Sequence, residues 1–144
     1  MTLDELLADL TTSMGAGEIT SDAGLLVMIR ELSVPFESSN AWLLAPVTDI
    51  HVDLDEPSID AFYGETGGEG LSVNDLIGRA KEFPREYREY QVFASRVVTS
   101  ADQTRRVRFD TPVAAVAVSQ GTYCLIEWYE GIGGEMQGVP SLRP

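Results

Sequence analysis

The sequence predicts an α+β fold in which short N-terminal helices precede an antiparallel β-sheet or sandwich formed mainly by the C-terminal half. Early in the chain, apolar residues recur at the i, i+3, i+4, i+7 spacing of an amphipathic helix. From Tyr87 onward they recur at every second residue, the period of a strand. The length of 144 residues predicts one domain. Its acidic helical first half covers about 1–84, its β-rich second half about 85–131, and a tail follows at 132–144.

Two helices are predicted in the first 35 residues. Thr2 and Glu5 have the spacing of a capping box, and the leucines that follow predict a helix that ends before Gly15. The segment 20–32, TSDAGLLVMIREL, repeats the helical spacing and predicts a second helix. Pro35 would end it, because the residue before a proline avoids helical geometry.

A strand and a third helix are predicted in the middle of the chain. Residues 46–57 alternate apolar and polar side chains, which indicates a strand with one buried and one solvent-facing side. Ser72 and Asp75 resemble a second capping box, and Pro84 would end the helix that it begins.

The second half predicts four strands joined by short turns. The bend DTP at 110–112 and the turn QG at 120–121 separate three of them. The strands are predicted at 90–100, 105–109, 113–119 and 122–130. Such closely spaced strands are typical of a meander or a sandwich, and no internal repeat is visible in the sequence.

Charge is distributed unevenly along the chain, whose net charge is −13. Residues 1–75 contain 15 acidic residues and one basic residue, a net charge of −14, whereas residues 76–144 contain 8 acidic and 9 basic residues, a net charge of +1. Such a division suggests a contact between acidic and basic surfaces, inside one chain, between copies or with a partner.

The composition also excludes several classes of function. Strong negative charge disfavours direct binding to nucleic acid or to an anionic membrane. The N-terminus lacks the basic region of a signal peptide, and the longest apolar runs are too short to span a bilayer. We therefore expect a virion or cytoplasmic location. One lysine against nine arginines fits a halophilic or GC-rich source.

One set of side chains has the residue types of a metal or acid–base site. Asp49, His51, Asp53 and Asp55 alternate along a predicted strand and would share one face. They could bind a divalent cation, or His51 could act as a base. Alternating acids on a water-facing strand are more often an exposed surface of an acidic protein, so we predict no metal and no cofactor.

A second set has the composition of a protein interface. Arginines alternate with tyrosines near the start of the second half, and further arginines follow along the predicted strands. Tyr and Arg are enriched at interface hot spots, so the set predicts a protein-contact surface. Its members are Arg85, Tyr87, Arg88, Tyr90, Arg96, Arg105, Arg106 and Arg108.

The segment 104–131 resembles β-sandwich modules of virion and tail proteins of tailed viruses. The shared pattern is a polar strand, an FDTPV bend, a strand of small apolar residues, a turn with one glycine, and a longer strand that ends on glycine. The matching positions are Val107, Phe109, Asp110, Pro112, Val113, Val116, Val118, Gly121, Leu125 and Gly131. The resemblance implies a structural role without catalysis.

Three hypotheses for function follow. The first is a non-catalytic structural or assembly protein, a virion or tail component, that forms a homo-oligomer or larger assembly by protein–protein contacts. The second is an acidic inhibitor or immunity protein that blocks a basic site on a partner. The third is a small metal-binding domain or enzyme that uses the face formed by Asp49, His51, Asp53 and Asp55.

Overall fold

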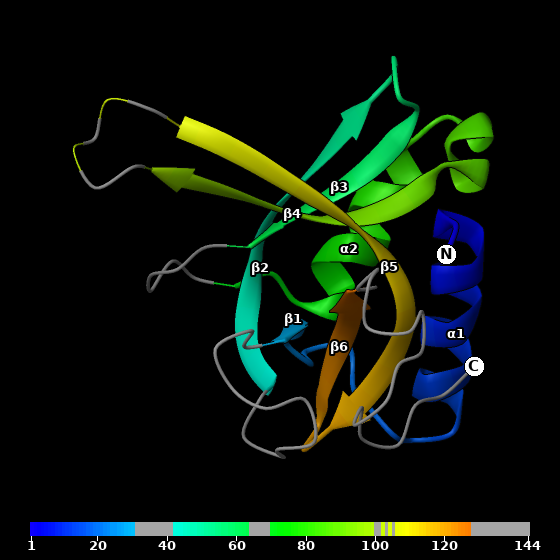
Figure 1. The fold of residues 1–144 in the computed structure, drawn as a ribbon. Helices are drawn as coiled ribbons and strands as arrows, with labels where there is room; N and C mark the ends of the chain where they lie inside the picture. Colours follow the sequence, from blue (N-terminus) through cyan, green and yellow to red (C-terminus); the bar gives the residue numbers. More distant parts are fainter. Residues whose placement is uncertain (31–41, 64–69, 100–101, 103, 105, 128–144) are drawn as a thin grey trace.

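A computed structural model describes most of the chain and shows a closed barrel of six strands in the described residues (Figure 1). The described residues are 1–30, 42–63, 70–99, 102, 104 and 106–127. The predicted tail at 132–144 and the end of the last predicted strand lie outside them.

The elements follow one another in two similar series. In chain order they are α1 (Leu3–Gly15), β1 (Leu25–Arg30), β2 (Trp42–Asp53), β3 (Ser58–Tyr63), α2 (Val73–Glu82), the short 3₁₀ helix η2 (Arg85–Glu89), β4 (Gln91–Thr99), β5 (Arg106–Ser119) and β6 (Thr122–Glu127). Both predicted capping boxes are present, with Thr2 capping α1 and Ser72 capping α2.

The predicted sandwich in the C-terminal half is wrong, because the first half contributes three strands and the sheet closes on itself. Each strand pairs with the next, and β1 closes the barrel by pairing in parallel with β6. The helix predicted at 20–32 is also wrong, because residues 25–30 form the strand β1. A short apolar run that is buried on both sides fits either period, and β1 lies between β2 and β6, where such burial is required.

The predicted bend at 110–112 is also wrong, because β5 runs through it without interruption. Its first part pairs with β4 as far as Pro112, and from Val113 it pairs with β6. Proline lacks a backbone N–H, so it is tolerated where a strand changes partner. The predicted turn after β5 is confirmed: Gln120 and Gly121 both have positive φ, 49° and 76°, as a two-residue type I′ hairpin requires.

The barrel contains an internal repeat that the sequence did not reveal. The unit α1-β1-β2-β3 recurs as α2-β4-β5-β6, with antiparallel pairs inside each unit and parallel pairs between units. The register shift between Val47 and Asp49 in β2 has its counterpart between Val113 and Ala115 in β5. The repeat therefore extends to single residues.

The two units contact each other through reciprocal backbone hydrogen bonds. Leu3 N donates to Tyr90 O at 2.9 Å, and in the other unit Val73 N donates to Ala23 O at 2.8 Å. These bonds fix the start of each helix beside the first strand of the opposite unit. One buried cluster contains leucines of α1, residues of α2 and inward-facing residues of all six strands, so both units share a core.

Candidate functional site

The predicted interface residues lie in two separate places. Arg85, Tyr87 and Arg88 belong to η2, and Tyr90 directly follows it. Arg96 lies in β4 and Arg108 in β5. Arg105 lies outside the described residues, and only the backbone of Arg106 is described. The structure thus divides one predicted surface into a region around η2 and a region on the β4–β5 pair.

The two tyrosines of this set pack within the molecule. Tyr87 stacks on Tyr90 with ring centroids 5.0 Å apart, and Phe83 lies 5.6 Å from Tyr87. All three are partly buried against the core. They anchor η2 on the barrel, which leaves the arginines of this region as its exposed members.

The acidic and basic halves meet inside the chain. Three arginines of residues 76–144 form ion pairs with aspartates of residues 1–75, which are Asp49–Arg79 at 2.8 Å, Asp4–Arg88 at 3.5 Å and Asp60–Arg108 at 2.6 Å. Part of the charge division therefore serves contacts between the two repeat units.

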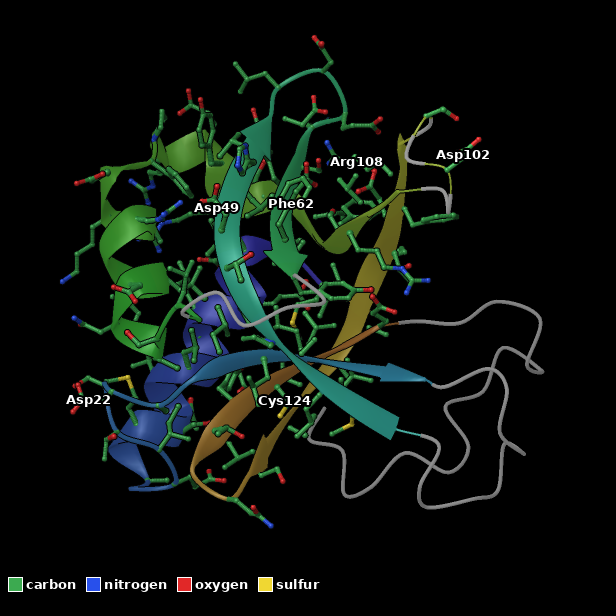
Figure 2. All side chains as sticks on the ribbon, turned by 90° about the vertical axis from the view of Figure 1, so that its left-hand side faces the viewer. Asp22, Asp49, Phe62, Asp102, Arg108 and Cys124 are labelled. Atoms are coloured by element: carbon green, nitrogen blue, oxygen red, sulfur yellow. The ribbon has the colours of Figure 1, made fainter. Side chains whose placement is uncertain are left out.

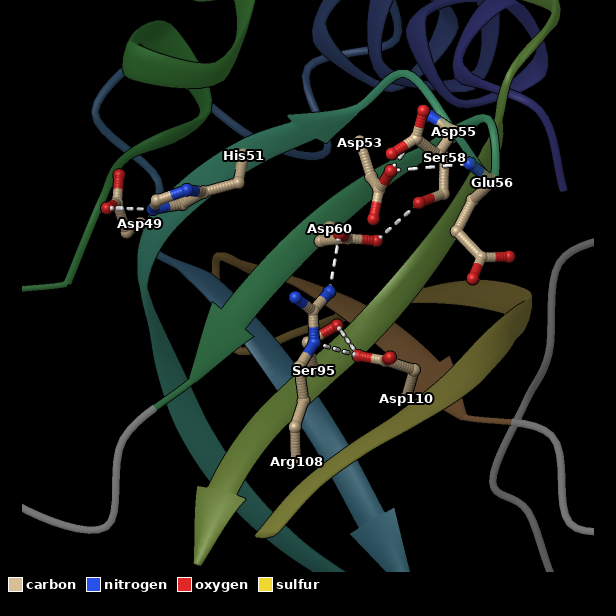
Figure 3. A network of polar contacts seen from close by, with 10 residues as sticks. All are labelled: Asp49, His51, Asp53, Asp55, Glu56, Ser58, Asp60, Ser95, Arg108 and Asp110. Carbon is tan, nitrogen blue, oxygen red and sulfur yellow. Dashed lines mark hydrogen bonds and ion pairs between the residues drawn. The ribbon is translucent and has the colours of Figure 1, made fainter. Parts of the chain in front are cut away.

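Arg108 is the centre of a polar cluster on the outer face of β3, β4 and β5 (Figure 3). Its Nη2 donates to Oδ2 of Asp60, and its Nε donates to Oδ1 of Asp110 at 2.8 Å. The hydroxyls of Ser58 and Ser95 donate to the same two carboxylates at 2.9 and 2.6 Å. Hydrogen bonding to Asp110, and more weakly to Asp60, raises the pKa of Arg108 against the opposing effect of burial.

Burial of the Asp60 carboxylate makes the loss of its partners energetically costly. Asp60 is only 2% exposed, so its charge needs partners, which Arg108 and Ser58 supply. The guanidinium also lies 4.8 Å from the ring centroid of Phe62. The sequence carries one signal of this cluster: Asp60 is the single charged residue of the strand SIDAFY.

Beyond this cluster, β4 and β5 continue as a two-stranded ribbon that projects from the barrel (Figure 1). Within the described residues, β3 pairs with β4 no further than Ser95, and β6 pairs with β5 only from Val113. Val97 is 37% exposed and Phe109 47% exposed. Their strand positions put them on opposite faces, and Arg96 lies over the Phe109 ring at 5.5 Å.

The four residues of the possible metal site do not converge. Asp49 accepts hydrogen bonds from His51 at 2.7 Å and from Arg79 at 2.8 Å, whereas Asp53 accepts from the backbone of Asp55 at 2.9 Å in the β2–β3 turn (Figure 3). Across the described ranges, no three His, Cys, Asp or Glu side chains are placed to hold a metal ion. Burial acts to raise the pKa of Asp49, but its hydrogen bonds outweigh that effect and lower it.

Cys124 is a buried residue of β6 beside Thr122, whose hydroxyl is 3.8 Å from its sulfur. Burial raises the pKa of its thiol. A cysteine in this setting behaves as a small apolar residue and not as a nucleophile.

A groove of about 890 Å³ lies where α1, α2 and η2 meet. The residues that line it are Asp4, Ala80, Lys81, Phe83, Arg85, Glu86, Arg88 and Glu89. Sequence reasoning found its two arginines but missed Asp4, because only the fold brings the start of α1 to η2.

Comparison of the chain with protein-family models, with curated proteins and with solved structures found no match. In the part of the chain that the structure describes, no helix combines the length and apolar character needed to cross a bilayer.

Proposed function

We propose that this protein is a non-catalytic assembly protein that binds other protein subunits through the β4–β5 ribbon. One observation carries the proposal: the ribbon leaves the barrel with apolar side chains, Val97 and Phe109, exposed on opposite faces. Exposed apolar residues with a neighbouring arginine are typical of the centre of a protein interface.

Side-chain hydrogen bonds fix the orientation of the ribbon at its base, which favours docking. Arg108 joins Asp60 of β3 to Asp110 of β5, and Ser95 of β4 donates to the same Asp110. A binding element whose orientation is fixed in advance loses less entropy when it meets its partner. The network therefore supports a ribbon that is prepared for binding.

A role as a virion or tail component stays a prediction from the resemblance of residues 104–131. The sandwich that the resemblance implied is replaced by a barrel, so the fold adds no support to it. If the prediction is correct, the partners of the ribbon are other subunits of the same particle.

Light scattering tests the proposal. We expect the wild-type protein to exceed the monomer mass in dilute buffer and in molar KCl, because salt does not screen apolar contacts. Combined Phe109→Ser and Val97→Ser should lower that mass. The matched control is Leu44→Ser, which changes an exposed leucine of β2 outside the ribbon and should leave the mass unchanged.

An unchanged mass in the ribbon variant would remove the ribbon from the proposal. A monomer at both salt concentrations would contradict self-assembly. It would favour instead the acidic inhibitor, whose complex with a basic partner should weaken as salt is added.

A further inference from the structure

Within the described residues, the β4–β5 ribbon has a long strand edge that no other strand covers. Along β5, residues 106–112 pair with β4 on one side, whereas β6 pairs with β5 only from Val113. No other described element forms a backbone hydrogen bond with 106–112. Figures 1 and 2 both show the ribbon extending past the barrel, with Asp102 at its far end in Figure 2. The ribbon therefore leaves the closed barrel with an edge that can accept a further strand.

The other edge of the ribbon is shorter and carries one sign of charge. β3 pairs with β4 as far as Ser95, so residues 96–99 form the open edge of β4 in the described chain. Arg96 is the single charged residue of these four. The β5 edge contains both signs of charge, with Arg108 two residues before Asp110. The β5 edge is therefore the better site for pairing with another strand.

We propose that the β5 edges of two copies pair antiparallel across a two-fold axis at Phe109, which joins the two ribbons into one sheet. This inference rests on the proposed function, because it names the partner subunit as a second copy of the chain and the contact as strand pairing. Such a contact is isologous and closes as a dimer. Main-chain hydrogen bonds supply the affinity when a strand is added to an edge, and the side chains set the register.

The order of residues along β5 is self-complementary in this register. Arg108 of each copy lies opposite Asp110 of the other, and Phe109 lies opposite its own counterpart. Opposite charges and aromatic pairs at directly opposed positions stabilise a sheet, whereas like charges destabilise it. A two-fold axis at Arg108 or at Asp110 would instead oppose two like charges. The sequence of the strand therefore favours the axis at Phe109.

The charged side chains of this edge retain capacity for a partner. Oδ1 of Asp110 accepts from Ser95 and Arg108, whereas no hydrogen bond from a described residue reaches Oδ2 of this 40% exposed carboxylate. Arg108 uses Nε and Nη2 for Asp110 and Asp60, and its Nη1 has no partner among the described residues. In the dimer the two Arg108 residues, like the two Asp110 residues, lie diagonally across the strand pair. Each of these charges is already paired within its own chain, which limits their repulsion.

A cysteine at the proposed axis tests this pairing in the full-length chain. Directly opposed residues of an antiparallel pair have Cα atoms about 4.5–5.5 Å apart, a separation that a disulfide can bridge. Phe109→Cys should therefore give a disulfide-linked dimer under mild oxidation, measured on a non-reducing gel. Cys124, the single native cysteine, is buried in β6 and lies well away from Arg108 in Figure 2, so it should not react.

Thr111→Cys is the matched control, because residue 111 lies on the same strand and the same face, two residues from the axis. In the proposed register its two copies are about 14 Å apart, beyond the reach of a disulfide. Phe109→Cys should form the linked dimer at least about 10-fold faster than Thr111→Cys. Far-ultraviolet circular dichroism confirms that both variants are folded. Equal rates, or no link in either variant, overturn the inference.

Hydrogen exchange of the wild-type protein, followed by NMR, tests the same pairing with Phe109 in place. Those amides of 106–111 that point to the open edge should exchange at least about 10-fold more slowly in concentrated than in dilute protein, because pairing shields them. The amides of β6 are the control, since β6 pairs with β1 on one side and β5 on the other within one chain. Their exchange should not depend on concentration. Exchange at 106–111 that is equally slow at every concentration would mean that one chain covers its own edge, and it would overturn the inference.

The outcomes also separate this inference from the proposed function. If Phe109→Ser with Val97→Ser lowers the mass while no link forms at residue 109, assembly through the ribbon stands and the edge pairing is wrong. If the link forms while the serine variant keeps its mass, the edge pairing stands and the proposed role of the apolar side chains is wrong. A wild-type monomer at all concentrations overturns both.

Discussion

Asp60 and Arg108 illustrate how much depends on single residues here. A nearly buried carboxylate and a 41% exposed guanidinium are 2.6 Å apart and join β3 to β5. Such a pair adds little stability over apolar residues of the same size, but breaking it leaves a buried charge without its main partner. The pair therefore fixes the position of the ribbon more than it stabilises the barrel.

Arg108→Ala should lower the free energy of unfolding by about 2 kcal/mol, below the range for fully buried pairs because the guanidinium is partly exposed. Urea unfolding at neutral pH measures the change. Arg96→Ala is the matched control on the same ribbon, where loss of the contact with Phe109 should cost less than about 1 kcal/mol. Equal losses in the two variants would contradict a special role for the Asp60 pair.

At the scale of elements, the two helices were predicted correctly because their signals are local. Thr2 with Glu5 and Ser72 with Asp75 form reciprocal capping hydrogen bonds three residues apart. The strands β1 and β3 were not recognised, because a strand that is buried on both faces lacks a distinctive period. The candidate surfaces could be predicted only in part: Arg88 and Arg108 are evident in the sequence, but their partners Asp4 and Asp60 come from the other repeat unit.

Ser72→Ala should lower the free energy of unfolding by about 1 kcal/mol, and Thr2→Ala should do the same, because each removes a side-chain acceptor from the first turn of a helix. Thr12→Ala is the control, because Thr12 is an exposed residue of α1 whose hydroxyl donates to the carbonyl of Ala8, and it should change stability by less than about 0.5 kcal/mol. Thermal unfolding followed by circular dichroism compares the three. A cap variant as stable as the control would contradict the capping role.

The whole molecule is best understood as one barrel made from two copies of the same unit. Leu6 of α1 and Leu76 of α2 occupy equivalent places, four residues after Thr2 and Ser72, and both belong to the shared buried cluster. The repeat is hard to see in the sequence because equivalent positions hold residues of different kinds: Asp60 of β3, in the polar cluster, corresponds in register to the buried Cys124 of β6. The two units therefore share a fold while equivalent positions differ in chemistry.

A shared core predicts that the two units unfold together. Leu6→Ala and Leu76→Ala should each cost about 2–4 kcal/mol, and both should shift the same single transition. Urea titration followed by circular dichroism and by aromatic fluorescence should give coincident curves for the wild type and for both variants. Two separate transitions, with each variant shifting only its own, would mean that the units are independent in spite of the barrel. A single transition would mean that the pairing of β1 with β6 makes stability a property of both units together. A destabilising change in one unit would then also unfold the surfaces that the other unit presents.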